Sequence, residues 1–159
     1  MLTEVIRLTL FPAMMAFAAT SDLFTMTIAN RVSLILIGGF VLLALLTGMS
    51  AHDMAIHAGT AAAAPAWIGG GDAKLAATTV LWLGVGHLAD YLIYASLLGG
   101  ALTLLLIQYR ALPMPKILLG REWAERLHRP DCGVPYGIAL AAAALVVYPQ
   151  TEWMTVLGL

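Results

Sequence analysis

Long stretches without a charged residue constrain the fold of this chain more than any other feature of its sequence. Six such intervals separate the charged residues, and they cover residues 8–21, 32–52, 54–71, 75–89, 91–109 and 132–151. A helix needs about 20 mostly apolar residues to cross the hydrocarbon core of a bilayer, within a range of roughly 17–25. Four of the six intervals reach this range. The sequence therefore predicts an all-α integral membrane protein.

The composition excludes several other classes of protein. Apolar residues make up 61% of the 159 residues and charged residues only 11%, whereas a soluble domain has about 25% charged residues. The formal net charge of -1 leaves no broad basic surface, so we expect no nucleic-acid partner. The single cysteine, Cys132, excludes an internal disulfide and a multi-cysteine zinc site. The lipid bilayer is the partner that this composition favours.

We expect a bundle of about six transmembrane helices. The predicted helices cover residues 2–21, 32–50, 54–69, 73–88, 91–109 and 134–155. No internal repeat or boundary divides the chain, so residues 1–159 are predicted to form a single membrane-embedded domain. A cleaved signal peptide is an alternative for the first segment, but five further apolar segments favour a retained helix.

The basic residues predict how the chain is oriented in the membrane. With six alternating spans, seven of the eight basic residues fall on one side and only Arg7 falls on the other. Short loops rich in Lys and Arg stay in the cytoplasm, so both termini are expected to be extracytoplasmic. The cytoplasmic loop at about 110–133 holds five of the basic residues. Two interpretations of its amphipathic segment Lys116–His128 stay open, namely a solvated loop whose positive charge only fixes topology and an amphipathic helix on the membrane surface.

Two carboxylates lie where the membrane makes an ionisable group costly. Asp22 follows the first predicted helix and Asp72 precedes the fourth, so both fall on the same face of the membrane. Such a residue is by default a functional hypothesis. The alternatives are purely structural roles, namely a helix N-cap for Asp72 and a charge at the lipid interface for Asp22.

Three glycines, residues 69–71, come directly before Asp72. Glycines are poor helix formers and suit a turn that another chain can approach closely. Two carboxylates brought close together share a proton. One can then activate water while the other polarises a carbonyl group. This is the chemistry of an aspartic protease, and it requires no metal and no cofactor.

Three short runs of sequence carry a resemblance to a known family. They are GGGDAKL at residues 69–75, Asp22 followed by IAN at residues 28–30, and VPYG at residues 134–137. The first resembles the Gly-x-Gly-Asp-x-Lys-Leu motif of the type IV prepilin peptidases, which are membrane aspartic proteases of the GxGD type. The second resembles the family's first motif, with Ala29 in place of the usual proline, and the third resembles its closing segment.

The resemblance implies a site and a substrate. It implies that Asp22 and Asp72 are catalytic and that Gly69, Gly71, Lys74 and Asn30 contact the substrate. The substrate would be a prepilin, a small single-helix membrane protein whose short basic leader is removed at the cytoplasmic face of the bacterial inner membrane. The paired cysteines of the larger members are missing, so the chain resembles the short form that accompanies Flp pili. Methyltransferase activity is therefore not expected, and pilus-assembly machinery is a further expected partner.

The sequence leaves two other functional classes open. A small proton- or cation-coupled transporter would use the same carboxylates, but it would favour inverted repeats and carboxylates near the bilayer midplane. A non-catalytic subunit of a pilus-assembly complex would tolerate the loss of either aspartate. Single residues also have simpler explanations, since Lys74 can serve as a topology marker and Asn30 as a helix cap.

Overall fold

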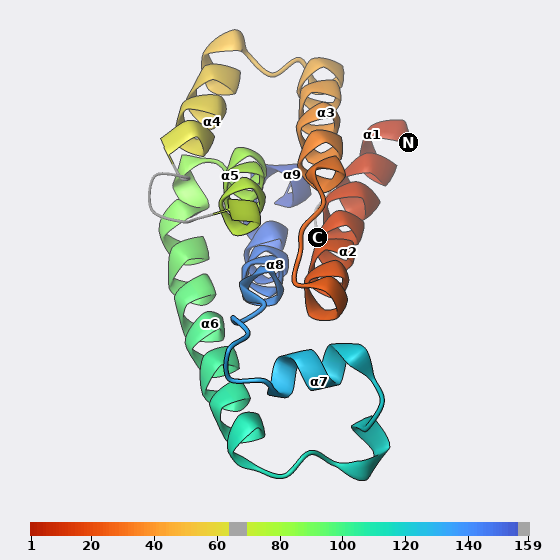
Figure 1. The fold of residues 1–159 in the computed structure, drawn as a ribbon. Coiled ribbons are helices and arrows are strands. Elements are labelled where there is room, and N and C mark those ends of the chain that lie inside the picture. Colours follow the sequence, from red (N-terminus) through yellow and green to blue (C-terminus); the bar gives the residue numbers. More distant parts are fainter. Residues whose placement is uncertain (64–69, 156–159) are drawn as a thin grey trace.

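The protein is described from a computed structural model, which covers residues 1–63 and 70–155. The described residues form helices joined by short linkers and include no strand (Figure 1). The α-helices are α1 (Leu2–Val5), α2 (Phe11–Thr25), α3 (Asn30–Thr47), α4 (Ala51–Ala63), α5 (Gly70–Leu83), α6 (Leu88–Ala111), α7 (Glu122–His128), α8 (Tyr136–Val147) and α9 (Glu152–Thr155). A π-helical turn, η1 (Ile6–Leu10), joins α1 to α2, and 3-10 turns cover η3 (Val85–His87), η4 (Lys116–Leu118) and η5 (Tyr148–Gln150).

The prediction of an all-helical membrane protein is confirmed. Three helical segments are long and apolar enough to cross a bilayer, namely Leu2–Thr25, Asn30–Thr47 and Val85–Ala111. The other predicted spans coincide with α4, α5 and α8, which have 13, 14 and 12 residues. These lengths are below that of a typical span, and part of the third predicted span, residues 64–69, lies outside the described residues. The count of six spans therefore stays a prediction.

The end of α2 is set by a left-handed residue. Met26 has a φ of 56°, and its amide donates to the carbonyl oxygen of Asp22 at 2.8 Å. This backbone conformation ends a helix because it turns the chain away from the helix axis. Ala29 is extended before α3 begins. Asp22 is thereby held in the last turn of α2, beside a short linker.

An aromatic cluster joins the helices at the other end of α2. Trp82 is fully buried and donates from its indole N–H to the carbonyl oxygen of Leu36 at 2.9 Å. The indole of Trp153 donates in turn to the carbonyl oxygen of Trp82 at 2.7 Å. Phe11 stacks on Tyr148 with a centroid distance of 4.3 Å. Aromatic side chains with satisfied polar atoms make such a cluster stable in an apolar interior.

The last long helix, α8, lies in the middle of the molecule. It packs against α2, α5 and α6, and Figure 1 shows it between α2 and α6. Its buried face consists mostly of small residues, including Gly137, Ala141 and Ala144. Small side chains let helix backbones approach closely in lipid. Gly99 of α6 serves the same purpose, because a Cβ at this position would collide with the Tyr136 ring.

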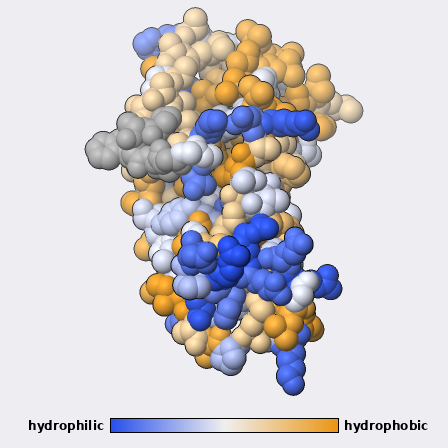
Figure 2. All heavy atoms as spheres, viewed as in Figure 1, coloured by the Kyte–Doolittle hydropathy of each residue, from blue (hydrophilic) through white to orange (hydrophobic). Residues whose placement is uncertain are grey.

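The segment after α6 is neither one continuous helix nor an open loop. Residues Lys116–His128 form a 3-10 turn followed by the separate helix α7. Gly120 interrupts the two with a φ of 78°, a conformation that a continuous helix excludes. The apolar face of α7 buries Ala124 and Leu127. Hydrophilic side chains gather over this part of the molecule, whereas apolar ones predominate over the upper part (Figure 2).

The Trp82 hydrogen bond gives a test of this packing. Trp82→Phe removes the indole hydrogen bond to the Leu36 carbonyl and leaves unfilled volume in the buried cluster, so we expect the free energy of unfolding to fall by about 1–3 kcal/mol. Unfolding in mixed micelles, followed by near-UV circular dichroism, measures it. Trp123→Phe is the matched control, because this partly exposed indole donates no hydrogen bond within the described residues. Equal effects of the two substitutions would contradict the assigned contact.

Candidate active site

Asp22 is held by the amino-terminal end of α8. The backbone N–H of Gly137 donates to Asp22 Oδ2 at 2.8 Å, and the Asp22 residue is only 4% exposed. Gly137 lies in the first turn of α8, where backbone N–H groups lack partners within the helix and carry partial positive charge. The interaction therefore fixes the orientation of the carboxylate and favours its negative charge.

A side chain at position 137 would displace its neighbours. A Cβ there would lie 2.8 Å from Asp22 Oδ2 and 2.7 Å from Cδ1 of Ile28. The absence of a side chain lets the α8 backbone approach α2 closely enough for the hydrogen bond. The sequence places Gly137 in a family-like run but assigns it no role. A glycine in the first turn of an apolar helix was the available signal.

Asp72 comes from a different part of the chain, in the first turn of α5. Gly70 begins this helix with a φ of 66°, a conformation that glycine adopts without strain. Gly71 packs against the linker after α2, since a Cβ there would lie 3.6 Å from Cβ of Ile28. This contact brings the start of α5 beside the end of α2. Gly69, which the sequence also places at the site, lies outside the described residues.

The two aspartates line one cavity of about 610 Å³. Its wall is formed by the end of α2 and the following linker, the start of α5, Arg126 of α7, and residues 132–134 before α8. Gly71, Lys74 and Asn30 line the same cavity, and Lys74 Nζ donates to Asn30 Oδ1 at 2.9 Å. Apart from Gly69, every residue that the sequence assigns to the site therefore lines this cavity.

Two arginines shape the cavity without forming an ion pair with either aspartate among the described residues. Arg126 donates to the carbonyl oxygen of Phe24 at 2.9 Å, where it satisfies one of the free carbonyls at the end of α2. The ring of Phe24 also contacts α7, because it packs edge to face against the ring of Trp123 with a centroid distance of 5.6 Å. The sequence indicates only a topological role for Arg126. Its partner lies 102 residues away, so no local pattern could reveal the contact.

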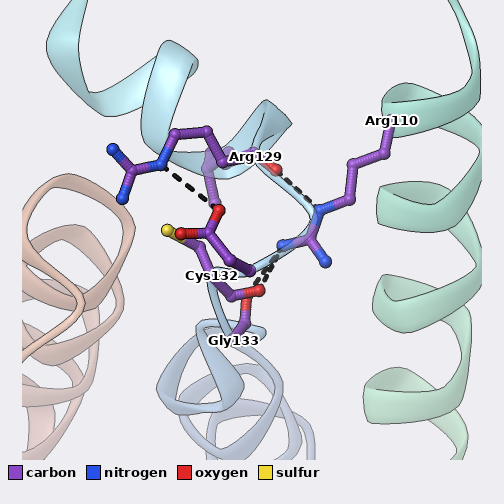
Figure 3. Close-up of polar contacts among 6 residues, drawn as sticks. Arg110, Arg129, Cys132 and Gly133 are labelled. Atoms are coloured by element: carbon purple, nitrogen blue, oxygen red, sulfur yellow. Dashed lines mark hydrogen bonds and ion pairs between the residues drawn. The ribbon is translucent and has the colours of Figure 1, made fainter.

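Arg110, in the last turn of α6, holds the linker that leads into α8. Its guanidinium donates to the carbonyl oxygens of Leu127, Cys132 and Gly133 at 2.8, 2.9 and 2.8 Å. Figure 3 shows this side chain reaching from α6 to the linker. The nearby pair of Arg129 and Asp131, at 3.4 Å, is solvent-exposed and contributes little. Arg110 is thus a positioning residue for the cavity wall and for the start of α8.

The fold and the cavity together define a helical membrane protein with a pair of aspartates at one end of its long helices. The model of the type IV leader peptidase family matches residues 9–104. This match covers more than half of the chain and contains Asp22 and Asp72. The chain therefore belongs to the type IV leader peptidase family, as its motifs indicate. Comparisons with curated proteins and with solved structures give no significant match.

The close approach at Gly137 predicts opposite effects for two glycine substitutions. Gly137→Ala forces Asp22 or Ile28 to move, so we expect the free energy of unfolding to fall by about 1–3 kcal/mol. Gly100→Ala, in the interior of α6, meets no atom within 4 Å and is expected to be neutral or stabilising by up to about 1 kcal/mol. Unfolding in mixed micelles measures both. Similar values for the two variants would show that α8 does not approach α2 as described.

The role of Arg110 is tested by hydrogen exchange. Arg110→Gln removes charge-assisted hydrogen bonds to three carbonyl groups, each worth about 1.5–3 kcal/mol. We expect amide exchange in residues 127–135 to become about tenfold faster or more. Arg121→Gln is the control, because Arg121 is exposed and its side chain makes no hydrogen bond within the described residues. If amide exchange in residues 127–135 is unchanged in Arg110→Gln, Arg110 does not position this linker.

Proposed function

We propose that this protein is a membrane aspartic endopeptidase that removes the short basic leader from a prepilin, with Asp22 and Asp72 as its catalytic pair. One observation carries the proposal: the two aspartates come from helix ends fifty residues apart and line the same cavity. Both lie within the segment that matches the type IV leader peptidase family, which supports a proteolytic rather than a structural use of the pair.

The chemistry follows from two carboxylates that share one proton. The ionised carboxylate takes a proton from a water molecule, and the water oxygen attacks the carbon of the scissile carbonyl group. The protonated carboxyl group gives its proton to the carbonyl oxygen, which yields a tetrahedral diol. When the diol collapses, the C–N bond breaks and a proton passes to the leaving amine.

The cavity favours a substrate with a basic leader. Lys74 is hydrogen-bonded to Asn30 and Arg126 to a backbone carbonyl, so neither cation neutralises the two aspartates. A basic leader supplies the opposite charge, while the apolar helix of the prepilin remains in the bilayer. We assign Gly69 and Gly71 to the turn that the substrate backbone approaches, and Lys74 and Asn30 to the substrate-facing wall.

The cellular setting follows from the same proposal. We place the protein in the bacterial inner membrane with the cavity at the cytoplasmic side and both termini extracytoplasmic, because of the distribution of basic residues. We propose an Flp-type prepilin as substrate, pilus-assembly machinery as a partner, and no methyltransferase activity. The transporter alternative is less favoured, because Asp22 and Asp72 lie in terminal turns of their helices rather than in the middle of a span.

Cleavage of a co-expressed Flp-type prepilin tests the proposal. We expect Asp22→Asn and Asp72→Asn to lower the cleavage rate by about 10²–10⁴-fold, because each removes a proton-transfer group. Asp90→Asn is the matched control, since Asp90 is an exposed aspartate in the first turn of α6. Cleavage is followed by the mass of the prepilin, with the membrane level of each variant measured in parallel.

Two outcomes would contradict the catalytic pair. If either Asn variant at the active-site cavity cuts at the rate of Asp90→Asn, the two aspartates do not act together. If the unaltered protein leaves every leader-bearing prepilin intact, the proposed substrate class is wrong.

A further inference from the structure

A second cavity, of about 630 Å³, lies at the opposite end of the long helices. Arg7 lines this cavity and Asp22 lines the first. The two residues are fifteen positions apart in one continuous helical segment. At a rise of 1.5 Å per residue this separation is about 22 Å. The second cavity is bounded by η1, the end of α3, the start of α4, η3 and α9. The proposed peptidase chemistry makes no use of it.

Arg7 is the residue that makes this cavity unusual. It is only 9% exposed, its Nε is buried without a hydrogen-bond partner, and it forms no ion pair among the described residues. Arg7 also lies within the candidate span Leu2–Thr25. A buried charge without a partner is strongly unfavourable, and in a membrane segment it indicates a functional site. No described carboxylate lies within ion-pair distance of the guanidinium, so an anionic group of a ligand can bind there.

Hydrogen bonds fix the backbone of Arg7 and another wall of the cavity. Arg7 lies in the π-helical turn η1, and such turns frequently occur at functional sites. The Tyr148 hydroxyl donates to the carbonyl oxygen of Arg7 at 2.8 Å. On another wall of the cavity, His57 is hydrogen-bonded through Nδ1 to the carbonyl oxygen of Leu81 at 2.7 Å. The cavity therefore has ordered walls.

The same cavity also carries negative charge and an apolar rim. The exposed carboxylates of Asp53 and Glu152 line it together with Arg7. Ile56 and Val85 line it as well, and they are 40% and 60% exposed. A ligand that satisfies all of these groups carries an anion for the guanidinium, a cation for the carboxylates, and an apolar part for the rim.

We propose that this cavity binds the phosphoethanolamine headgroup of a phospholipid. Arg7 binds the phosphate group, because the planar guanidinium presents paired N–H donors to phosphate oxygens. Glu152 and Asp53 receive the primary ammonium group, and the acyl chains lie along the apolar rim and the outer surfaces of the helices. This site is separate from the proposed peptidase site, and its occupancy is measured without any cleavage assay.

The test uses the full-length protein, stripped of lipid in detergent, and native mass spectrometry of lipid retained after reconstitution. Phosphatidylethanolamine, phosphatidylcholine and phosphatidylglycerol with identical acyl chains are compared, together with soluble phosphoethanolamine and inorganic phosphate. We expect phosphatidylethanolamine to be retained about tenfold more strongly than the other two lipids, because only its ammonium N–H groups reach the carboxylates. Arg7→Gln abolishes retention, and Arg7→Lys, which keeps the charge but loses the paired donors, weakens it.

Two further variants make the test specific. Glu152→Gln should remove the preference for phosphatidylethanolamine over phosphatidylcholine while phosphate binding persists. Arg31→Gln is the matched control, because Arg31 is an exposed arginine at the other end of α3, and it should behave as the unaltered protein. If Arg7→Gln fails to fold, the proposed site is tested by the headgroup preference of the unaltered protein and by the loss of this preference in Glu152→Gln.

Three results would overturn the proposal. The first is equal retention of the three lipids by the unaltered protein. The second is an unchanged preference in both Arg7→Lys and Glu152→Gln. The third is binding of soluble phosphoethanolamine or inorganic phosphate as strong as that of the lipid, which would make the site one for a soluble ligand.

Discussion

The hydrogen bond from the Gly137 amide to the Asp22 carboxylate is the contact on which the rest of the candidate active site depends. It requires that α8 meet the end of α2 without an intervening side chain, and glycine at 137 satisfies this requirement. The small residues along α8 extend the close packing to α2, α5 and α6. α5, which carries Asp72 in its first turn, also packs against α8. The Gly137 amide thus orients one carboxylate, and the packing of α8 supports the helix that carries the other.

The cations near the cavity are hydrogen-bonded to neutral oxygens of the chain. Arg110 and Arg126 donate to backbone carbonyl oxygens, and Lys74 donates to an amide oxygen. Each group therefore stabilises the chain around the aspartates without forming an ion pair with either of them among the described residues. A direct arginine–aspartate pair would favour full ionisation of the carboxylate, which the shared proton of the proposed mechanism excludes.

The sequence predicts the membrane class, the helical content and most of the site, because long apolar runs and an aspartate after three glycines are local signals. It does not predict the roles of Gly137, Arg110 or Arg126, since these depend on contacts between segments far apart in the chain. It leaves Lys116–His128 open between a loop and a helix, because hydropathy does not reveal the left-handed backbone of Gly120. In the sequence, Arg7 is only the one basic residue on the opposite side from the other seven, and the packing of η1, α4 and α9 shows the cavity beside it.

The position of α8 along the chain has a consequence for biosynthesis. Asp22 and its donor are separated by 115 residues, and chains are made from the amino terminus at about 5–20 residues per second. The first helices therefore enter the membrane several seconds before the helix that completes the site exists. During that interval Asp22 lacks the Gly137 amide. The candidate active site therefore lacks this contact until the last long helix is inserted.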